Sequence, residues 1–255
     1  MTISIEVKSS QVQARTSRER TAKRVLAEFH SGLPERLLCF LDDQNWPTFK
    51  KVIGPANRGF YAPVKEDEFW TIWPEYLKDC VLVEDPSSRL LKRAFDHVIY
   101  LHGGTCEHEI GLSMTLAHEL QHAVQHTTSP TLWAVNTLVQ YFPKHVIRKL
   151  NLKWFDIPIE RECRIVSKRV AEKLFGPDAT RQFVEWNIIN AVDAQDSDDW
   201  RFIRQLDTSA PYDLAEKSRL IFQLTEFRLE LEKLLEEFRD DPDFNSLNLN
   251  EVLVS

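Results

Sequence analysis

A strand followed directly by a helix, both predicted within residues 96–126, most constrains the fold of this chain. Residues 96–101 are mainly β-branched and aromatic and lead to two glycines, which is typical of a strand that ends in a turn. Residues 107–126 then continue to a Thr-Thr-Ser-Pro sequence that ends at Pro130, and they predict a helix that stops there. Because most of the other helical pattern lies later in the chain, this order indicates an α+β fold.

Apolar spacing extends the pattern to the rest of the chain. Residues 16–43 predict two helices separated by a Gly- and Pro-containing break, and residues 46–85, rich in proline and aromatic residues, predict short strands and loops. A further helix is predicted over 156–174, and mostly helical structure over 178–238. The polar residues 240–255 predict a poorly ordered tail.

Composition and charge limit the classes of function. The chain has 255 residues, of which 43% are hydrophobic and 28% charged, the balance of an ordinary globular protein. Its formal net charge of −7 disfavours nucleic acid as the main partner, because phosphate binding requires a basic surface. The sequence contains neither the apolar core of a signal peptide nor a run of about 18 apolar residues that would span a membrane.

The cysteines give a further indication of the compartment. Cys39, Cys80, Cys106 and Cys163 are widely spaced and form no CxxC pair. A disulfide framework is not expected in a chain of this size, and reduced thiols suit the cytoplasm. We therefore expect a cytoplasmic protein in which Cys106, close to the predicted helix, is a small packed residue.

The predicted helix contains the sequence His118-Glu119-Leu120-Gln121-His122. Histidines at positions i and i+4 project from the same face of a helix, so both imidazoles can bind one metal ion. Zinc accepts imidazole and carboxylate donors. The glutamate that follows the first histidine can take the proton from a water molecule that attacks a carbonyl group. This arrangement predicts a hydrolytic zinc site.

The motif is specific enough to carry that prediction. With 8 histidines in 255 residues, about 0.02 matches would arise by chance. The flanking residues Thr115 to Ala117 and Ala123-Val124 are uncharged, as a helix inside a domain requires. The strand that ends at Gly103-Gly104 also offers a strand edge that could hold an extended peptide by main-chain pairing.

These residues resemble the zincin superfamily of metallopeptidases, whose members place an HExxH helix beside a strand that binds substrate. The resemblance implies that a third ligand completes the site, and in the gluzincins this is a glutamate of an ExxA sequence on a later helix. Glu160 matches that spacing, with Cys163 where the motif has alanine. Several gluzincin groups have an aspartate soon after this ligand, whereas Arg164 and Val166 stand there in this chain.

Two glutamates compete for the role of third ligand. Glu160 and Glu162 flank the apolar stripe of their helix almost symmetrically, so helical periodicity does not separate them. The ExxA spacing favours Glu160, and the choice stays open. Other polar residues could steady the oxyanion of a tetrahedral intermediate, as a His or Tyr does in thermolysin-like enzymes; the candidates are His102, His108, Tyr141 and His145. For His126, a surface or supporting role is expected.

Apolar residues near the C-terminus repeat at spacings of four and three residues: Leu220, Leu224, Phe227, Leu231, Leu234 and Phe238. This seam predicts one long helix. We expect it to pack on its own domain in a monomer, with pairing of two chains as the alternative.

Together these features predict a metallopeptidase, most simply a metalloendopeptidase, with one zinc ion per chain and a peptide or protein substrate. His118, His122 and Glu160 would hold the metal, and Glu119 would act as the general base. The alternative is a catalytically silent zincin-like binding or regulatory module. Four parts are expected: residues 1–95 in the catalytic domain, a zincin core over 96–176, a helical region over 177–240, and a tail over 241–255.

Overall fold

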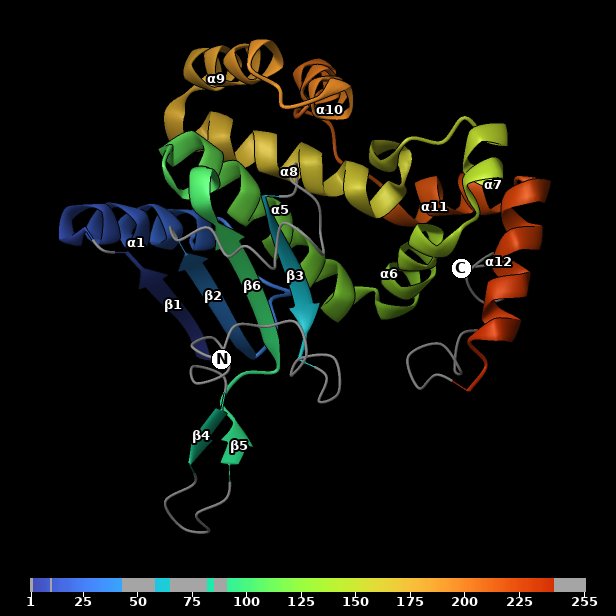
Figure 1. The fold of residues 1–255 in the computed structure, drawn as a ribbon, viewed down its shortest axis with the longest axis horizontal. Helices are drawn as coiled ribbons and strands as arrows, with labels where there is room; N and C mark the ends of the chain where they lie inside the picture. Colours follow the sequence, from blue (N-terminus) through green and yellow to red (C-terminus); the bar gives the residue numbers. More distant parts are fainter. Residues whose placement is uncertain (1, 10, 43–57, 65–81, 85–90, 241–255) are drawn as a thin grey trace.

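The computed structural model describes residues 2–9, 11–42, 58–64, 82–84 and 91–240. These residues form the predicted α+β fold, in which a four-stranded sheet is combined with many helices (Figure 1). The predictions for Cys80, for most of residues 46–85 and for the tail after Asp240 lie outside the described residues. Within the part that is described, no helix is both long and apolar enough to cross a membrane.

The sheet has the strand order β1-β2-β6-β3. Strands β1 (Thr2–Lys8), β2 (Arg36–Asp42) and β6 (His97–His102) run parallel, and β3 (Gly59–Pro63) pairs antiparallel with β6. The predicted strand over 96–101 is therefore confirmed as β6. It lies inside the sheet, however, so the expectation that it offers a free edge is wrong. Among the described strands of this sheet, β3 is the edge strand beside β6.

Strand β2 corrects a second expectation. Residues 16–43 were expected to form two helices, and α1 (Val12–Leu26) is one of them, but the second is a strand. Every residue of β2 after Arg36 is buried. Because β2 is covered on both faces, its sequence is a continuous apolar run without the alternation that identifies a half-exposed strand.

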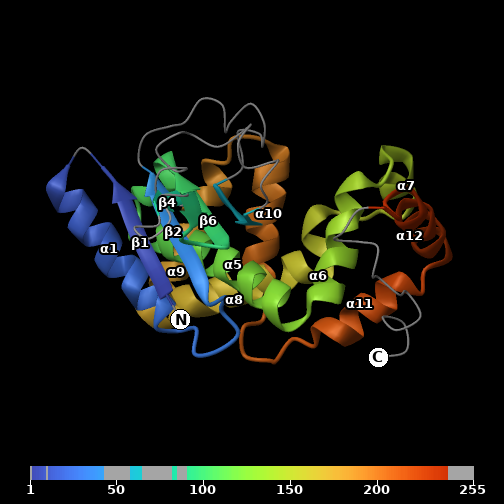
Figure 2. The ribbon, with the colours of Figure 1, turned by 90° about the horizontal axis from the view of Figure 1, so that it is seen from below.

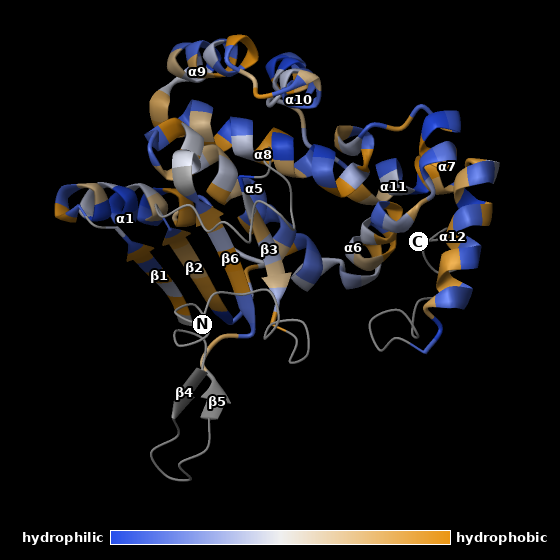
Figure 3. Ribbon diagram, viewed as in Figure 1, coloured by the Kyte–Doolittle hydropathy of each residue, from blue (hydrophilic) through white to orange (hydrophobic). Residues whose placement is uncertain are grey.

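The main core lies between the sheet and the helices on one of its faces. Helix α1 and helix α5 (Glu109–Thr128) cover that face, and α8 (Pro158–Phe175) packs against α5 (Figure 2). Leu37, Cys39 and Leu41 of β2 belong to this core, and the apolar character of the strands is visible in Figure 3. The predicted helices over 107–126 and 156–174 are thus confirmed to within about two residues, as expected for helix ends.

Helix α8 begins and ends at residues that suit those positions. Pro158 stands in the first turn, where its missing N–H removes no helical hydrogen bond. Gly176, at φ +89°, ends the helix in a backbone conformation that other residues rarely adopt. Helices α9 (Pro177–Ile189) and α10 (Ala194–Gln205) follow, and both pack against α8.

A second group of helices packs beside the sheet-containing part (Figures 1 and 2). It consists of α6 (Pro130–Thr137), α7 (Lys144–Lys149), α11 (Leu214–Phe222) and α12 (Thr225–Glu237). Buried apolar side chains of these helices, of residues 138–142 and of the start of α8 form one cluster, called here the C-terminal cluster: Val135, Leu138, Val139, Phe142, Val146, Ile157, Ile159, Phe222, Phe227, Leu231 and Leu234.

The prediction of one long C-terminal helix is wrong. Leu224 has an extended backbone, with ψ 122°, so the chain breaks between α11 and α12. The break brings the rings of Phe222 and Phe227 to a centroid separation of 5.5 Å inside the C-terminal cluster. Leu220 and Leu224 are left 53% and 45% exposed, so the seam is not a continuous buried stripe.

The remaining described elements are short. Strands β4 (Leu82–Glu84) and β5 (Leu91–Arg93) form a separate antiparallel pair. Three-residue and four-residue 3₁₀ segments are η1 (Gly103–Cys106), η2 (Leu138–Tyr141) and η3 (Trp154–Asp156). Segment η1 connects β6 to α5 and so turns the chain directly from the sheet into the helix that carries the motif.

Candidate metal centre

Helix α5 presents the two motif histidines on one side and apolar residues on the other. Leu116, Ala117, Leu120 and Ala123 are fully buried against the core, which fixes the rotation of the helix. The rings of His118 and His122 lie on the side toward α8, with centroids 4.8 Å apart. The spacing of four residues therefore brings both imidazoles to one place, as the helical geometry requires.

Glu160, in the first turn of α8, contacts both histidines. Its Oε2 lies 3.4 Å from Nε2 of His118, and its Oε1 lies 3.2 Å from Nε2 of His122. Glu162 is directed elsewhere, and its Oε2 accepts a hydrogen bond of 2.7 Å from Nε2 of Gln125. Of the two glutamates between which the sequence does not decide, the structure thus brings Glu160 to the histidines.

Arg164 holds the Glu160 carboxylate in place. Its Nη1 donates to Oε2 of Glu160 at 2.8 Å, and its Nε donates to Oδ1 of Asp199 on α10 at 2.6 Å. The side chain is only 9% exposed, so both contacts occur away from bulk water. Burial would raise the pKa of Glu160, but the neighbouring His122 and His118 hold that pKa well below its usual value. Glu160 is therefore a carboxylate, the form that binds metal ions.

Glu119 lies beside this group and is 7% exposed. Burial raises its pKa, while the nearby His118 and His122 act in the opposite direction. The backbone N–H of Tyr61 on β3 also interacts with the Glu119 carboxylate and favours its charged form. The edge strand β3 therefore lies next to the residue expected to act as base, a position that the sequence assigned to β6.

Cys163 offers a second way to hold a metal ion. The nearest donor atoms of His118, His122 and Cys163 lie within 4.8 Å of one another, so these three residues could bind an ion. Cys163 approaches Nδ1 of His122, at 3.4 Å, whereas Glu160 approaches Nε2. Burial raises the pKa of the Cys163 thiol to about 12. A thiol must lose its proton before it binds a metal ion, whereas the Glu160 carboxylate already lies within 3.4 Å of Nε2 of both histidines.

His126, which was expected to support the site or lie at the surface, belongs to another group. The Tyr61 hydroxyl lies 2.8 Å from Nδ1 of His97 on β6 and 2.5 Å from Nδ1 of His126 on α5. The His126 ring also packs against Trp133, with centroids 4.4 Å apart. This group, called here the tyrosine clamp, joins β3 to both β6 and α5.

The candidates for steadying an oxyanion are dispersed. His108 caps the start of α5, where its Nδ1 accepts from the N–H of Ile110, and its ring packs on Phe183. Tyr141 packs against Phe238 in the C-terminal part, and His145 is an exposed residue of α7. His102 is buried at the end of β6. The structure does not bring these four residues together.

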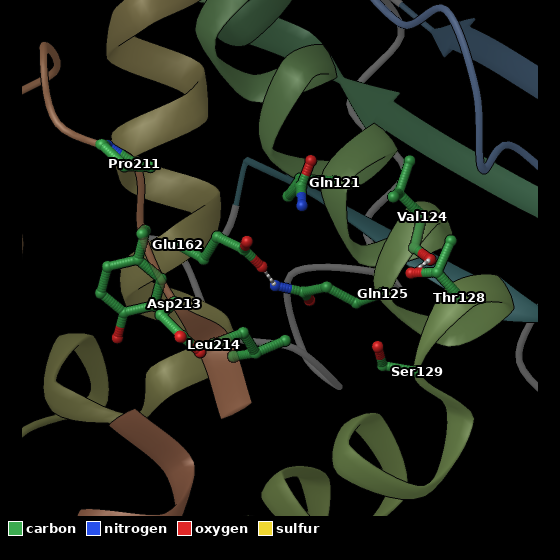
Figure 4. Close-up of a pocket in the computed structure, with 10 residues that line it drawn as sticks. Gln121, Val124, Gln125, Thr128, Ser129, Glu162, Pro211, Asp213 and Leu214 are labelled. Atoms are coloured by element: carbon green, nitrogen blue, oxygen red, sulfur yellow. Dashed lines mark hydrogen bonds between the residues drawn. The ribbon is translucent and has the colours of Figure 1, made fainter. Parts of the chain in front are cut away.

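A cavity of about 540 Å³ borders the other side of the contact between α5 and α8. Gln121, Gln125 and Glu162 line it together with the segment Pro211–Leu214 (Figure 4). On a helical wheel of α8, Glu160 and Glu162 lie on opposite sides of the stripe that faces α5. The cavity and the histidine Nε2 atoms therefore lie on opposite sides of the helix pair, and Gln125 connects them.

Comparison with known proteins adds no relationship: no protein-family model, no curated protein and no solved structure matches this chain. The zincin resemblance therefore rests on the motif residues. What the site can do chemically follows from the geometry of His118, Glu119, His122 and Glu160.

Proposed function

We propose that this chain is a zinc-dependent peptidase that binds one zinc ion per chain through His118, His122 and Glu160. The observation that carries the proposal is the position of Glu160, whose carboxylate oxygens lie within 3.4 Å of the Nε2 atoms of both histidines. Two imidazoles and one carboxylate from two helices are the donor set of many hydrolytic zinc sites. The same set leaves a coordination position for water or substrate.

Each residue of the site has a distinct task in this proposal. His118 and His122 bind through Nε2, and Arg164 keeps the Glu160 carboxylate turned toward them. Bound zinc supplies Lewis acidity, which polarises a carbonyl group and lowers the pKa of water. Glu119 accepts the proton of the attacking water and passes it to the leaving amine. Burial suits this task, because it raises the pKa of Glu119 and so makes the carboxylate a better base.

Strand β3 supports a peptide as substrate. It lies at the edge of the sheet among the described strands, and its Tyr61 backbone interacts with Glu119. An extended peptide that pairs with the main chain of β3 would run past the base and the histidines. The proposal therefore extends to hydrolysis of an extended segment of peptide or protein.

Replacement of Glu119 by glutamine tests the chemistry separately from the metal. Glu119→Gln keeps the size and hydrogen-bonding capacity of the side chain but cannot accept the proton. We expect hydrolysis of a library of unfolded protein substrates to fall by about 10²–10⁴, while zinc content measured by atomic absorption stays at that of the wild type.

The double variant His118→Ala, His122→Ala is the matched control, and it should lose both zinc and activity. Full zinc retention in the double variant would refute the metal site. Unchanged hydrolysis by Glu119→Gln would refute the proposed base while leaving the metal site intact.

A further inference from the structure

Gln125 lies three residues after His122 on α5 and is 1% exposed. Its side-chain amide has a partner for each of its polar atoms. Nε2 donates to the backbone carbonyl of Ile159 at 3.0 Å and to Oε2 of Glu162 at 2.7 Å. Oε1 lies 3.0 Å from Nδ1 of His122. Sγ of Cys163 lies 3.6 Å from the same oxygen. Partners at both ends of this buried amide indicate a fixed rather than a rotating side chain.

These partners determine which way the amide is turned. A backbone carbonyl accepts hydrogen bonds and never donates, so the NH₂ group must face Ile159 and Glu162. The amide oxygen must then face His122, and at 3.0 Å from Nδ1 it would be repelled by a nitrogen lone pair. Nδ1 of His122 therefore carries the hydrogen. Nε2, 3.2 Å from the Glu160 carboxylate, is also placed to donate, so its lone pair becomes available when a bound metal ion replaces that hydrogen.

Glu162 anchors this arrangement from the cavity. Figure 4 shows its carboxylate bonded to the Gln125 amide at the wall of the cavity, between the two helices. Without Glu162, the NH₂ group of the amide would keep only the carbonyl of Ile159 as an acceptor. Glu162, which does not contact the histidines directly, thus contacts the residue that does, Gln125.

We propose that Gln125 is a positioning residue for the metal ligand His122, and that Glu162 in turn orients Gln125. The amide oxygen holds the imidazole in the Nδ1–H form and at the rotation that directs Nε2 to the metal. Partners of this kind on metal-binding histidines change metal affinity by about 10- to 100-fold. The inference rests on the proposed zinc site. In this chain Arg164 and Val166 stand where several gluzincin groups have an aspartate, and the proposal gives the task of supporting a ligand histidine to Gln125 and Glu162 instead.

The alternative set of metal donors, which includes the thiolate of Cys163, predicts a different hydrogen position on His122. If Cys163 and Nδ1 of His122 were the metal donors, Nδ1 would carry no hydrogen and Gln125 would lose its partner. Cobalt bound by a thiolate shows intense near-ultraviolet charge-transfer absorption, whereas cobalt bound by imidazole and carboxylate does not. The cobalt-substituted protein therefore distinguishes the two donor sets directly.

The experiment measures zinc affinity of the full-length protein by competition with a fluorescent chelator. Gln125→Leu keeps the approximate volume but removes the acceptor, and we expect the zinc dissociation constant to rise by about 10- to 100-fold. Gln121→Leu is the matched control, because Gln121 lines the same cavity and its amide bonds to Glu162 rather than to His122. Its zinc affinity should stay within a few-fold of wild type.

A charge-conserving exchange separates positioning from simple loss of structure. In the double variant Gln125→Glu, Glu162→Gln, the new glutamate accepts from His122 and from the new glutamine, but it has no donor for the carbonyl of Ile159. We expect this exchange to recover part of the zinc affinity that Gln125→Leu loses. In the zinc-loaded wild type, nitrogen-15 NMR should show a hydrogen on Nδ1 of His122.

Four outcomes would overturn the inference. Equal zinc affinity of wild type and Gln125→Leu would show that Gln125 does not position His122, and it would leave the proposed function intact. Thiolate absorption in the cobalt protein, or a hydrogen on Nε2 of His122, would replace the donor set. Absence of zinc binding by the wild type would refute the proposed function and this inference together.

Discussion

Arg164 shows how the position of one buried charge determines the role of another. It stands between the carboxylates of Glu160 and Asp199, and each contact is shorter than 3 Å. Removing one partner from a buried pair is costly because the remaining charge is left without compensation. Arg164 is therefore needed whether or not a metal is bound, and it keeps the carboxylate oriented before the metal arrives.

The two glutamates of α8 provide a matched pair for testing the third metal donor. Glu160→Gln should raise the zinc dissociation constant by at least about tenfold, because an amide is a weaker donor than a carboxylate. Glu162→Gln should have a smaller effect, since its amide oxygen can still accept from Gln125. Isothermal titration with zinc measures both. The reverse order would move the third donor to Glu162 and leave the histidine pair unchanged.

The sequence predicts part of the site because that part depends on local spacing. His118, Glu119 and His122 follow from the period of one helix, and the ExxA spacing directs attention to Glu160. Gln125 and Arg164 were missed as supporting residues. Each contacts a site residue of its own helix, but the partners that fix it, Glu162 for Gln125 and Asp199 for Arg164, lie on another helix. A sequence does not show how two helices face each other. The signals available were a polar residue three positions after His122 and a charge beside an apolar stripe.

Among the elements, strand β3 depends most on side-chain contacts for its position. The tyrosine clamp joins it to β6 through His97 and to α5 through His126. One of the two Nδ1 atoms accepts from the Tyr61 hydroxyl and the other donates to it, so the two rings have complementary hydrogen positions. The clamp thereby holds the strand next to Glu119.

Removal of the Tyr61 hydroxyl should loosen this strand. Tyr61→Phe keeps the ring but leaves two partly buried imidazole nitrogens without that partner, which costs about 1 kcal/mol. We expect faster amide hydrogen exchange in β3 than in wild type, with β2 unchanged, when exchange is followed by mass spectrometry. Tyr141→Phe is the control, because Tyr141 is 50% exposed. Equal exchange in β3 of wild type and Tyr61→Phe would mean that main-chain pairing alone holds the strand.

Element prediction from the sequence succeeded for helices with one distinct face and for β6, whose β-branched and aromatic residues are followed by two glycines. Helices α5 and α8 and strand β6 were predicted with nearly correct bounds. Strand β2 was mistaken for a helix because both of its faces are buried and its apolar run has no period. The break at Leu224 was missed because the spacing of four and three continues across it. In both cases tertiary packing, rather than local preference, decides the structure.

At the scale of the whole molecule, the C-terminal cluster is a separate centre of packing. Leu231 of α12 is 1% exposed within it, whereas Leu229, two residues earlier, is 53% exposed. The cluster draws on α6, η2, α7 and the start of α8 as well as on the last two helices. Apolar residues of α12 thus find partners in their own chain.

The difference in burial between Leu231 and Leu229 gives a matched pair of variants for testing whether α12 packs within its own chain. Leu231→Ala should lower the free energy of unfolding by about 2–5 kcal/mol, and Leu229→Ala should change it by less than about 0.5 kcal/mol. Urea denaturation measures both. We expect light scattering to give the 29.8 kDa mass of one chain for wild type and for both variants. A wild-type mass of two chains that Leu231→Ala reduces to one without unfolding would show pairing through α12.

The parallel pairing of β2 with β6 has a consequence for how the chain folds. Leu37 pairs with His97, so about 60 residues of chain must be closed into a loop before these strands meet. Contacts between distant residues slow the folding of a domain, and parallel strands are among the slowest to pair. The surface on which α5 packs exists only after this step. The two histidines share one helix, but the core against which that helix packs is complete only then, so an ion held together with Glu160 would stabilise the folded protein.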